Sequence, residues 1–305
     1  MAEQTRSFLQ ARFEQCGIHP KTKYGQNFLI DMNLQRMIVD SGEITREDLV
    51  FEVGTGTGAL TARVAQLAGA VLSIEVDYQM HALASEELSE FDNVTLLLTD
   101  ALRNKNAFSD EVLGKLDSTL AEKSLARYKL VANLPYNIAT PVLSNLLRRE
   151  NPPEVMVATI QKELADRIIA KPRSKDYSAL SIWMQAQAEV EIVRIMAPSV
   201  FWPRPKVESA IVRIRYKPEL RARISDLEAF HEFNRAMFFH RRKFLRSVLL
   251  SYYKKRLGKP EVDAVMSELG YDGNTRAEEL PVDEMIKLCE ASERMLRETI
   301  AKNEA

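Results

Sequence analysis

The chain has 305 residues, of which 46% are hydrophobic and 28% are charged, so it has room for a large apolar core and a second, smaller domain. It contains no run of about 18 apolar residues, and acidic residues interrupt its N-terminus, so we expect no membrane span and no secretory signal. Its two cysteines lie far apart and its four histidines are scattered, which predicts a cytoplasmic protein without disulfides or a metal site.

Short apolar runs alternate with helical stretches in the first half of the chain. We expect strands at residues 49–53, 70–75, 94–100, 128–133 and 154–160. Strands separated by helices predict a mostly parallel sheet with right-handed crossovers, and therefore an α/β, Rossmann-like fold. The polar segment 103–127 is long for a connection, and we interpret it as a helical or partly mobile insertion.

The sequence changes character near residue 217, where short helices replace strands. The spacing of apolar and basic residues from His231 to Lys255 predicts one helix with an apolar side and a basic side. Glycine and proline residues separate the later helices. We therefore expect two domains, residues 1–217 and a small all-helical domain at residues 218–305.

Three strand ends carry residues suited to a nucleoside-containing cofactor. Glu52, Gly54 and Gly56 belong to a glycine-rich turn between a strand and a helix, where the absence of Cβ atoms allows a close approach. Glu75 ends the next strand, where a carboxylate can accept hydrogen bonds from ribose hydroxyls. Asp100-Ala101 ends the third, within reach of an adenine amino group.

A dinucleotide remains an alternative ligand for such a crevice. However, pyrophosphate favours helix N-termini and nearby cations. S-adenosylmethionine has no phosphate and carries a positive sulfonium, which the acidic Glu52 beside the glycines suits better. The pattern therefore favours S-adenosylmethionine, with S-adenosylhomocysteine as the product.

The tetrapeptide Asn133-Leu134-Pro135-Tyr136 follows the fourth strand and indicates an adenine substrate. An exocyclic amine is a poor nucleophile, because its lone pair is delocalised into the ring. The Asn133 side-chain oxygen and a backbone carbonyl can accept its two N–H groups and so free the lone pair. Pro135 stiffens the turn, and Tyr136 can stack on a base that is flipped out or unpaired. A strand-ending turn without a catalytic role is the alternative interpretation.

A second aromatic residue would complete a sandwich around the base. Phe201, in a proline-rich loop, is our candidate, although such a loop also suits core packing. Arg204 and Lys206 in the same loop are candidate phosphate contacts.

In these motifs the chain resembles the KsgA (RsmA) family of small-subunit ribosomal RNA adenine dimethyltransferases, and the resemblance covers nearly the whole chain. Gln26-Asn27-Phe28-Leu29 is similar to the family's N-terminal cofactor motif, which closes over the methionine part. By this resemblance Gln26, Asn27 and Leu29 join the cofactor contacts, as does Asn133. It also implies a class I methyltransferase sheet, with a catalytic first domain and an RNA-binding helical domain.

The resemblance further implies the substrate: two adjacent adenosines in a hairpin near the 3′ end of small-subunit rRNA, within an assembling 30S-type particle. The chain departs from the family at Thr55, where proline is common, and at Ser178 and Ser247, where glycine and asparagine are common. The segment between Asp100 and Asn133 is also longer than usual. These departures affect loops and RNA docking, but they remove no chemical group from the expected site.

Charge is distributed unevenly, although the net charge is only -1. Residues 204–260 contain 16 Lys and Arg against 5 Asp and Glu, whereas residues 261–305 contain 5 against 12. We expect a basic surface that binds RNA phosphates, although a solvated helix face is the alternative. Its candidate residues are Arg241, Arg242, Lys243 and Arg246.

Three other functions remain open. They are methylation of large-subunit rRNA, as in the related antibiotic-resistance enzymes, a non-catalytic RNA-binding assembly or transcription factor, and methylation of adenine in DNA. The intact tetrapeptide argues against a loss of chemistry. The loop at Phe201 and the motif Arg276-Ala277-Glu278 favour the small-subunit branch. We see no sustained heptad pattern and expect a monomer.

Overall fold

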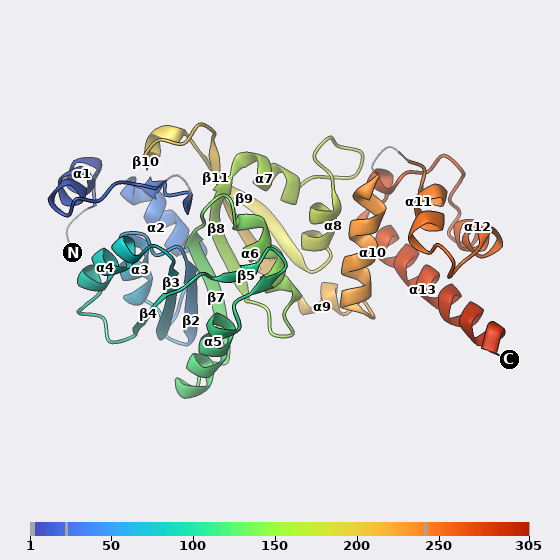
Figure 1. Cartoon of the computed structure of the whole chain (residues 1–305), viewed down its shortest axis with the longest axis horizontal. Helices are drawn as coiled ribbons and strands as arrows, with labels where there is room; N and C mark the ends of the chain where they lie inside the picture. The colour runs from blue at the N-terminus through green and yellow to red at the C-terminus, as the bar shows by residue number, and fades with distance from the viewer. Residues whose placement is uncertain (1–3, 22–23, 241–242, 305) are drawn as a thin grey trace. The chain divides into compact units, whose positions relative to one another are not determined.

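The computed structural model describes residues 4–21, 24–240 and 243–304, which form two compact units (Figure 1). The first unit comprises Met1–Ala165 and Val190–Tyr216, and the second comprises Asp166–Glu189 and Lys217–Ala305. Within the described chain, no helix combines the length and apolar character that crossing a membrane requires.

A seven-stranded sheet forms the centre of the first unit, in the order β4-β3-β2-β7-β8-β11-β9. Its strands are β2 (Asp48–Val53), β3 (Ala70–Glu75), β4 (Val94–Leu98), β7 (Arg127–Asn133), β8 (Val155–Gln161), β9 (Ala188–Met196) and β11 (Ser209–Tyr216). The five strands from β4 to β8 are parallel, and β11 is antiparallel to β8. The predicted α/β fold and its five strands are confirmed, whereas β9 and β11 were not predicted.

The strand order places the site, because the chain moves outward from β2 through β3 to β4 and then returns to the other side of β2 with β7. In open parallel sheets, ligands bind beyond the carboxyl ends of the strands at such a reversal. The residues that end these strands, including Glu75 and Asn133, therefore meet at one edge.

Helices cover both faces of this sheet. They are α2 (Met32–Ser41), α3 (Ala59–Ala65), α4 (Tyr78–Glu87), α5 (Asp110–Glu122) and α6 (Ala139–Arg148). Successive side chains of β2 point to opposite faces of the sheet and pack against the helices or loops there. Val50 packs in a cluster with Ile38 of α2 and Val64 of α3, whereas the ring centroid of Phe51 lies 6.0 Å from that of Phe108.

The polar insertion forms regular structure. It begins with a hairpin of β5 (Leu102–Asn104) and β6 (Ala107–Phe108) and continues into α5, which buries Val112, Leu116 and Leu120. The segment therefore forms an ordinary crossover helix, which was one of the two interpretations of its sequence.

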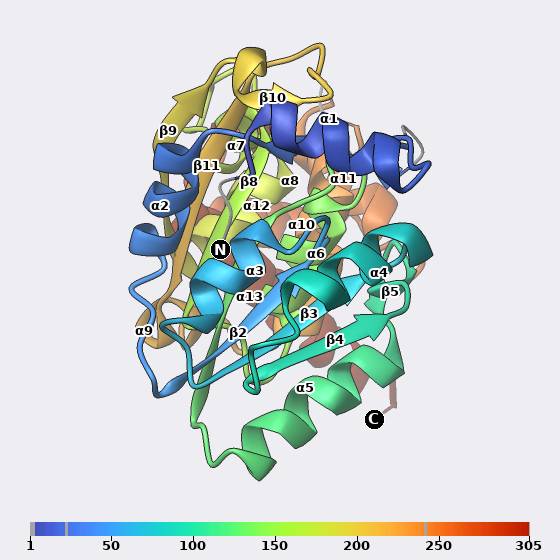
Figure 2. The same cartoon turned by 90° about the vertical axis from the view of Figure 1, so that its left-hand side faces the viewer.

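The N-terminal segment lies across the same unit (Figure 2). Leu9 and Phe13 of α1 (Arg6–Gln15) pack with Met80 and Leu83 of α4 and with Phe28. β1 (Phe28–Leu29) pairs with β10 (Phe201–Trp202), which follows the 3-10 helix Pro198–Val200. These contacts fix the chain between residues 24 and 29 near the ends of the parallel strands.

The second unit consists of helices. They are α8 (Ala179–Gln185), α9 (Pro218–Arg221), α10 (Leu227–Phe239), α11 (Leu245–Tyr252), α12 (Lys259–Glu268), the 3-10 helix Ala277–Glu279 and α13 (Val282–Glu304), while α7 (Lys162–Ile168) spans the boundary. The single helix predicted from His231 to Lys255 is wrong. α10 ends at Phe239, and Leu245 N–H donates to Thr275 O (2.8 Å), a contact that a continuous helix would forgo.

The unit boundary lies close to the predicted one, with one difference. Asp166–Glu189 belongs to the second unit, although the sequence placed it in residues 1–217. Tyr177 Oη donates to Leu280 O (2.8 Å), and Asn234 Nδ2 donates to Ala179 O (2.8 Å), so buried polar contacts bind this segment to the later helices. The division into catalytic and RNA-binding functions stays a prediction.

Candidate active site

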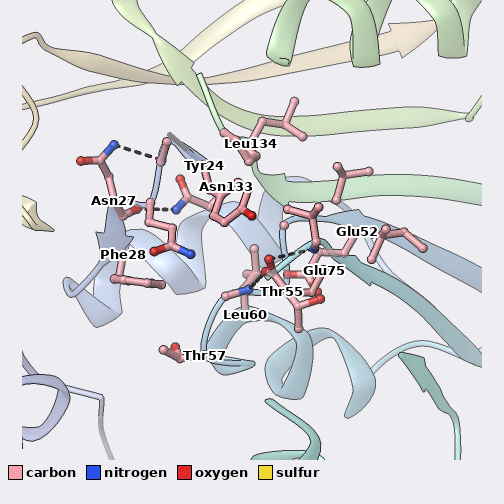
Figure 3. A pocket seen from close by; sticks show the side chains of 18 of the residues that line it. Tyr24, Asn27, Phe28, Glu52, Thr55, Thr57, Leu60, Glu75, Asn133 and Leu134 are labelled. Carbon is pink, nitrogen blue, oxygen red and sulfur yellow. Dashed lines mark hydrogen bonds between the residues drawn. The ribbon is translucent and has the colours of Figure 1, made fainter. Parts of the chain in front are cut away.

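A cleft opens at the carboxyl ends of the parallel strands (Figure 3). It encloses about 1030 Å³, including space that reaches bulk solvent. Every residue expected to contact the cofactor lines it, namely Gln26, Asn27, Leu29, Glu52, Gly54, Gly56, Glu75, Asp100, Ala101 and Asn133. Pro135 and Tyr136 line it as well. The structure therefore brings the cofactor motifs and most of the adenine motif together.

The glycine-rich turn lies directly against the tetrapeptide. Gly54 has φ +88°, and a Cβ added there would stand 3.1 Å from Pro135 Cδ. Any side chain at this position would therefore be strained and would also crowd the proline ring. The glycine allows the ends of β2 and β7 to meet without filling the cleft between them.

Glu75 is held by the backbone at the end of β3. Gly56 N–H donates to Oε2 (2.8 Å), while Val76 N–H and Asp77 N–H donate to Oε1 (both 2.9 Å). Burial raises the pKa of the Glu75 carboxyl, although these three hydrogen bonds oppose the shift. The carboxylate is thus fixed in position and can still accept ligand hydroxyl groups.

Glu52 lines the cleft, but its carboxylate is directed to neighbouring hydroxyl groups. Thr61 Oγ1 and Ser73 Oγ donate to Oε2 at 2.5 and 2.6 Å, and the side chain is 1% exposed. Burial raises the pKa of Glu52 to about 7, with a further contribution from the nearby Glu75 charge. In this structure Glu52 therefore links β2 to β3 and α3 through hydrogen bonds. The contact with the cofactor that the sequence suggests stays a prediction.

The side-chain amide of Asn133 is oriented by the N-terminal segment. Asn133 Nδ2 donates to Asn27 O at 2.9 Å (Figure 3). Because the amide nitrogen is engaged on that side, Oδ1 is left as an acceptor for another group. The Asn27 carbonyl thereby selects which end of the amide faces a substrate.

Gly25 allows this segment to approach the tetrapeptide. It has φ +63°, and an added Cβ would lie 3.3 Å from Asn137 Oδ1 and 3.4 Å from Tyr136 N. Asn27 Nδ2 donates to the Gly25 carbonyl (3.2 Å), which stabilises the bend.

Tyr136 is fixed through its hydroxyl group. Its Oη lies 2.6 Å from Ser209 Oγ, and Ser209 on β11 is fully buried. Burial raises the pKa of the Tyr136 phenol, so the ring stays neutral at physiological pH. A neutral ring at the cleft wall suits stacking on a nucleobase.

Phe201 does not lie on the cleft wall, and that prediction is wrong. Its side chain is 3% exposed and packs in the hydrophobic core with Leu29 and Ile211. The pairing of Phe201 with Leu29 across β10 and β1 places the ring in the core. Tyr24 and Val76, which the sequence reasoning missed, line the cleft instead. Val76 could have been found as an apolar residue directly after a strand-ending acid.

The expected RNA contacts fall into three groups. Arg204, Lys206 and Lys243 are exposed. The Arg246 guanidinium pairs with both carboxylate oxygens of Asp263, at 2.5 and 2.9 Å, so part of its donor capacity is used. Arg241 and Arg242 lie outside the described residues. In the described ranges, no group of three or more His, Cys, Asp or Glu side chains could hold a metal ion.

Comparisons with known proteins extend these observations. The family model for ribosomal RNA adenine dimethylase matches residues 18–293. A Listeria innocua protein named ribosomal RNA small subunit methyltransferase A is 37% identical over 269 residues, covering 88% of this chain and 89% of its own length. The protein of the same name from Pediococcus pentosaceus is 38% identical over 283 residues, covering 92% of each chain.

Two solved structures share the fold. A dimethyladenosine transferase from Plasmodium falciparum has a TM-score of 0.71 at 22% identity, covering 87% of this chain and 97% of its own. The 23S rRNA methyltransferase ErmE has a TM-score of 0.61 at 24% identity, and the match covers 88% of this chain and 100% of the ErmE chain. The chain therefore shares the fold of these two structures, and the family match spans both units. On this evidence the chain belongs to the ribosomal RNA adenine dimethylase family.

Proposed function

We propose that the protein transfers methyl groups from S-adenosylmethionine to the 6-amino groups of two adjacent adenosines in a hairpin near the 3′ end of small-subunit rRNA. The products are dimethyladenosines, and the activity belongs to ribosome biogenesis. The observation that carries this proposal is the Asn133 amide, which Asn27 O orients in the cleft that Glu75 also lines. Family membership supports the choice of substrate.

The residues of the cleft fit the cofactor. Glu75, with its backbone-fixed carboxylate, would accept the ribose hydroxyls, and Asp100 would accept the adenine amine. Leu102 N–H donates to Asp100 Oδ1 (2.9 Å), which fixes that side chain at the cleft edge. Gly54 and Gly56 leave room beside Pro135, and the segment Gln26–Leu29 would cover the methionine part. When bound, S-adenosylmethionine supplies an electrophilic methyl group on a sulfonium.

The tetrapeptide would prepare the adenine amine. Asn133 Oδ1 accepts one of its N–H groups, and a backbone carbonyl accepts the other. Pro135 O already accepts from Ile138 N–H (3.1 Å), so we assign the second acceptor to Leu134 O. The lone pair of the amine would then be available to form the new C–N bond while the bond between that methyl carbon and the sulfonium sulfur breaks. S-adenosylhomocysteine would be the leaving group, and one amine proton would pass to water. The rate enhancement would come from holding the amine and the methyl group in the reactive geometry, and no covalent intermediate with the protein is needed.

Tyr136 would hold the unpaired base by stacking, with its ring set by Ser209. Each adenosine receives two methyl groups, so the pocket must accept a base that already carries one. The cofactor must also be exchanged between transfers.

The basic residues would bind the RNA backbone. Arg204, Lys206 and Lys243 are exposed for phosphate contacts, and Arg241, Arg242 and Arg246 are assigned the same role from the sequence. We propose that the substrate is an assembling 30S-type particle in the cytoplasm, that the protein acts as a monomer, and that it needs no metal.

The direct test is transfer of a labelled methyl group from S-adenosylmethionine to immature small subunits, followed by mass spectrometry of the rRNA. We expect dimethyladenosine at two adjacent positions. Label on 50S particles or on duplex DNA would contradict the proposed substrate. Absence of label from every nucleic acid, with cofactor still bound, would support a non-catalytic RNA-binding protein instead.

A further inference from the structure

The segment that crosses the cleft is held at two points. Asn27 O accepts from Asn133 Nδ2 at one of them. At the other, Lys21 Nζ lies 3.1 and 2.9 Å from the two carboxylate oxygens of Asp77, and Gln26 Nε2 donates to Asp77 Oδ2 (3.1 Å). Lys21 N–H also donates to Gln26 Oε1 (2.6 Å), so the three side chains form one cluster.

Asp77 is part of the turn that presents Glu75. It is 2% exposed, caps α4 by accepting from Gln79 N–H (2.9 Å), and donates its own N–H to Glu75 Oε1. Burial alone would raise the pKa of Asp77, but hydrogen bonds from Lys21, Gln79 and Gln26 hold it below its ordinary value. The carboxylate is therefore ionised at neutral pH and attracts Lys21.

We propose that Lys21, Gln26 and Asp77 form a latch that holds residues 24–29 over the cleft, and that the Lys21–Asp77 pair sets how tightly the cofactor is retained. The inference rests on the proposed function, because it takes S-adenosylmethionine as the ligand. Lys21 and Asp77 are positioning residues: they act through the segment that carries Gln26 and Asn27.

The accessibility of the pair suits a latch that must open repeatedly. The Lys21 side chain is 37% exposed, whereas the Asp77 side chain is 2% exposed. Water can therefore replace the lysine when the segment lifts, while Asp77 keeps its backbone partners. Two methyl transfers to each adenosine require cofactor exchange, and each exchange requires the segment to move.

The expected effect follows from the closed fraction of the segment. If only the closed form binds cofactor fully, the apparent Kd rises in proportion to the loss of that form. Replacing Lys21 by Met leaves a buried carboxylate without its cation and disfavours the closed form. If the fraction of molecules with the segment closed falls to roughly a tenth of its wild-type value, the apparent Kd for the cofactor rises about 10-fold. Saturating cofactor restores closure, so kcat should stay within about 2-fold.

The test uses the full chain with four variants. Lys21→Met removes the cation, and Lys21→Arg keeps it. Asp77→Asn removes the carboxylate charge but keeps a good helix cap. Lys115→Met on α5 makes the same charge change elsewhere in the first unit. The measurements are Kd for S-adenosylmethionine and S-adenosylhomocysteine by calorimetry, dissociation rate by stopped flow, and amide hydrogen exchange of residues 24–29 without cofactor.

We expect Lys21→Met and Asp77→Asn to raise both Kd values about 10-fold, mainly through faster dissociation, and to accelerate exchange at residues 24–29. Lys21→Arg should restore both properties, and Lys115→Met should leave both unchanged. Unchanged exchange and affinity in Lys21→Met would overturn the latch. If the wild type binds no S-adenosylmethionine, the proposed function fails, whereas the exchange measurement still tests the latch by itself.

Discussion

The hydrogen bond between Tyr136 and Ser209 gives the sharpest test of how the cleft wall is built. Tyr136→Phe keeps the ring but removes the hydroxyl group that lies 2.6 Å from Ser209 Oγ. Ser209 is fully buried, so its hydroxyl group would lose its partner without gaining access to water. Leaving a buried polar group unsatisfied costs about 1–3 kcal/mol. We therefore expect Tyr136→Phe to lower the free energy of unfolding by about 1–2 kcal/mol.

Removing both hydroxyl groups should be less harmful than removing either one. Ser209→Ala leaves the half-buried Tyr136 hydroxyl group without its partner, whereas Tyr136→Phe/Ser209→Ala leaves no unsatisfied group. The double-mutant cycle should therefore give a coupling energy of about 1 kcal/mol. Urea unfolding of the four proteins measures it.

The same variants separate stacking from ring orientation. Tyr136→Phe keeps the aromatic face, so we expect transfer to small subunits to fall only about 3–10-fold, whereas Tyr136→Ala also loses about 1–3 kcal/mol of base stacking. Strictly additive stabilities in the cycle, together with equal activities of Tyr136→Phe and Tyr136→Ala, would refute both the hydrogen bond and the stacking role.

Three further predictions concern other parts of the site and its support. Asn133→Ala should lower kcat about 10²–10³-fold with an unchanged circular dichroism spectrum, because it loses the oriented acceptor for the amine, and near-normal transfer would contradict that role. Burial raises the pKa of Glu52 from its ordinary value of 4.5, which applies in the unfolded chain, to about 7 in the folded protein. The stabilisation that comes from binding this proton is therefore complete below pH 4.5 and is lost as the pH rises to about 7. Glu52→Gln should therefore be more stable than the wild type at pH 8, by up to about 3 kcal/mol, and equal to it near pH 4, in thermal melts without cofactor. Lys129→Met should lower the free energy of unfolding by about 3–5 kcal/mol in urea titrations, because the fully buried Asp48 would lose the ammonium 3.0 Å away, and a loss under 1 kcal/mol would indicate that Arg127 suffices.

Much of the first unit could be predicted, because its strands are short apolar runs whose ends carry recognisable side chains. Gly54, Glu75 and Asn133 end three parallel strands, and parallel topology alone brings them to one edge. β9 follows the helices α7 and α8 and is buried only at its two ends, and β11 carries Arg213 and Arg215 among its apolar residues. Both strands therefore leave a weaker apolar signal in the sequence.

Other features depend on contacts distant in sequence. Phe201 is drawn into the core by its pairing with Leu29, and no local pattern around it reveals that partner. The break between α10 and α11 accompanies a hydrogen bond to Thr275, which is 30 residues away from Leu245 along the chain. The Lys21–Asp77 pair joins residues 56 positions apart. Propensity and spacing carry no information about such pairings.

The pairing of β1 with β10 has a consequence for synthesis on the ribosome. Phe28 and Leu29 leave the exit tunnel early, but their partners Trp202 and Phe201 follow more than 170 residues later. A nascent chain that ends before Phe201 can form the parallel strands from β2 to β8, yet it lacks the strand that fixes the segment over the cleft. The cofactor cleft is therefore among the last parts of the first unit to be completed, and affinity for S-adenosylmethionine should emerge only after two-thirds of the protein has been translated.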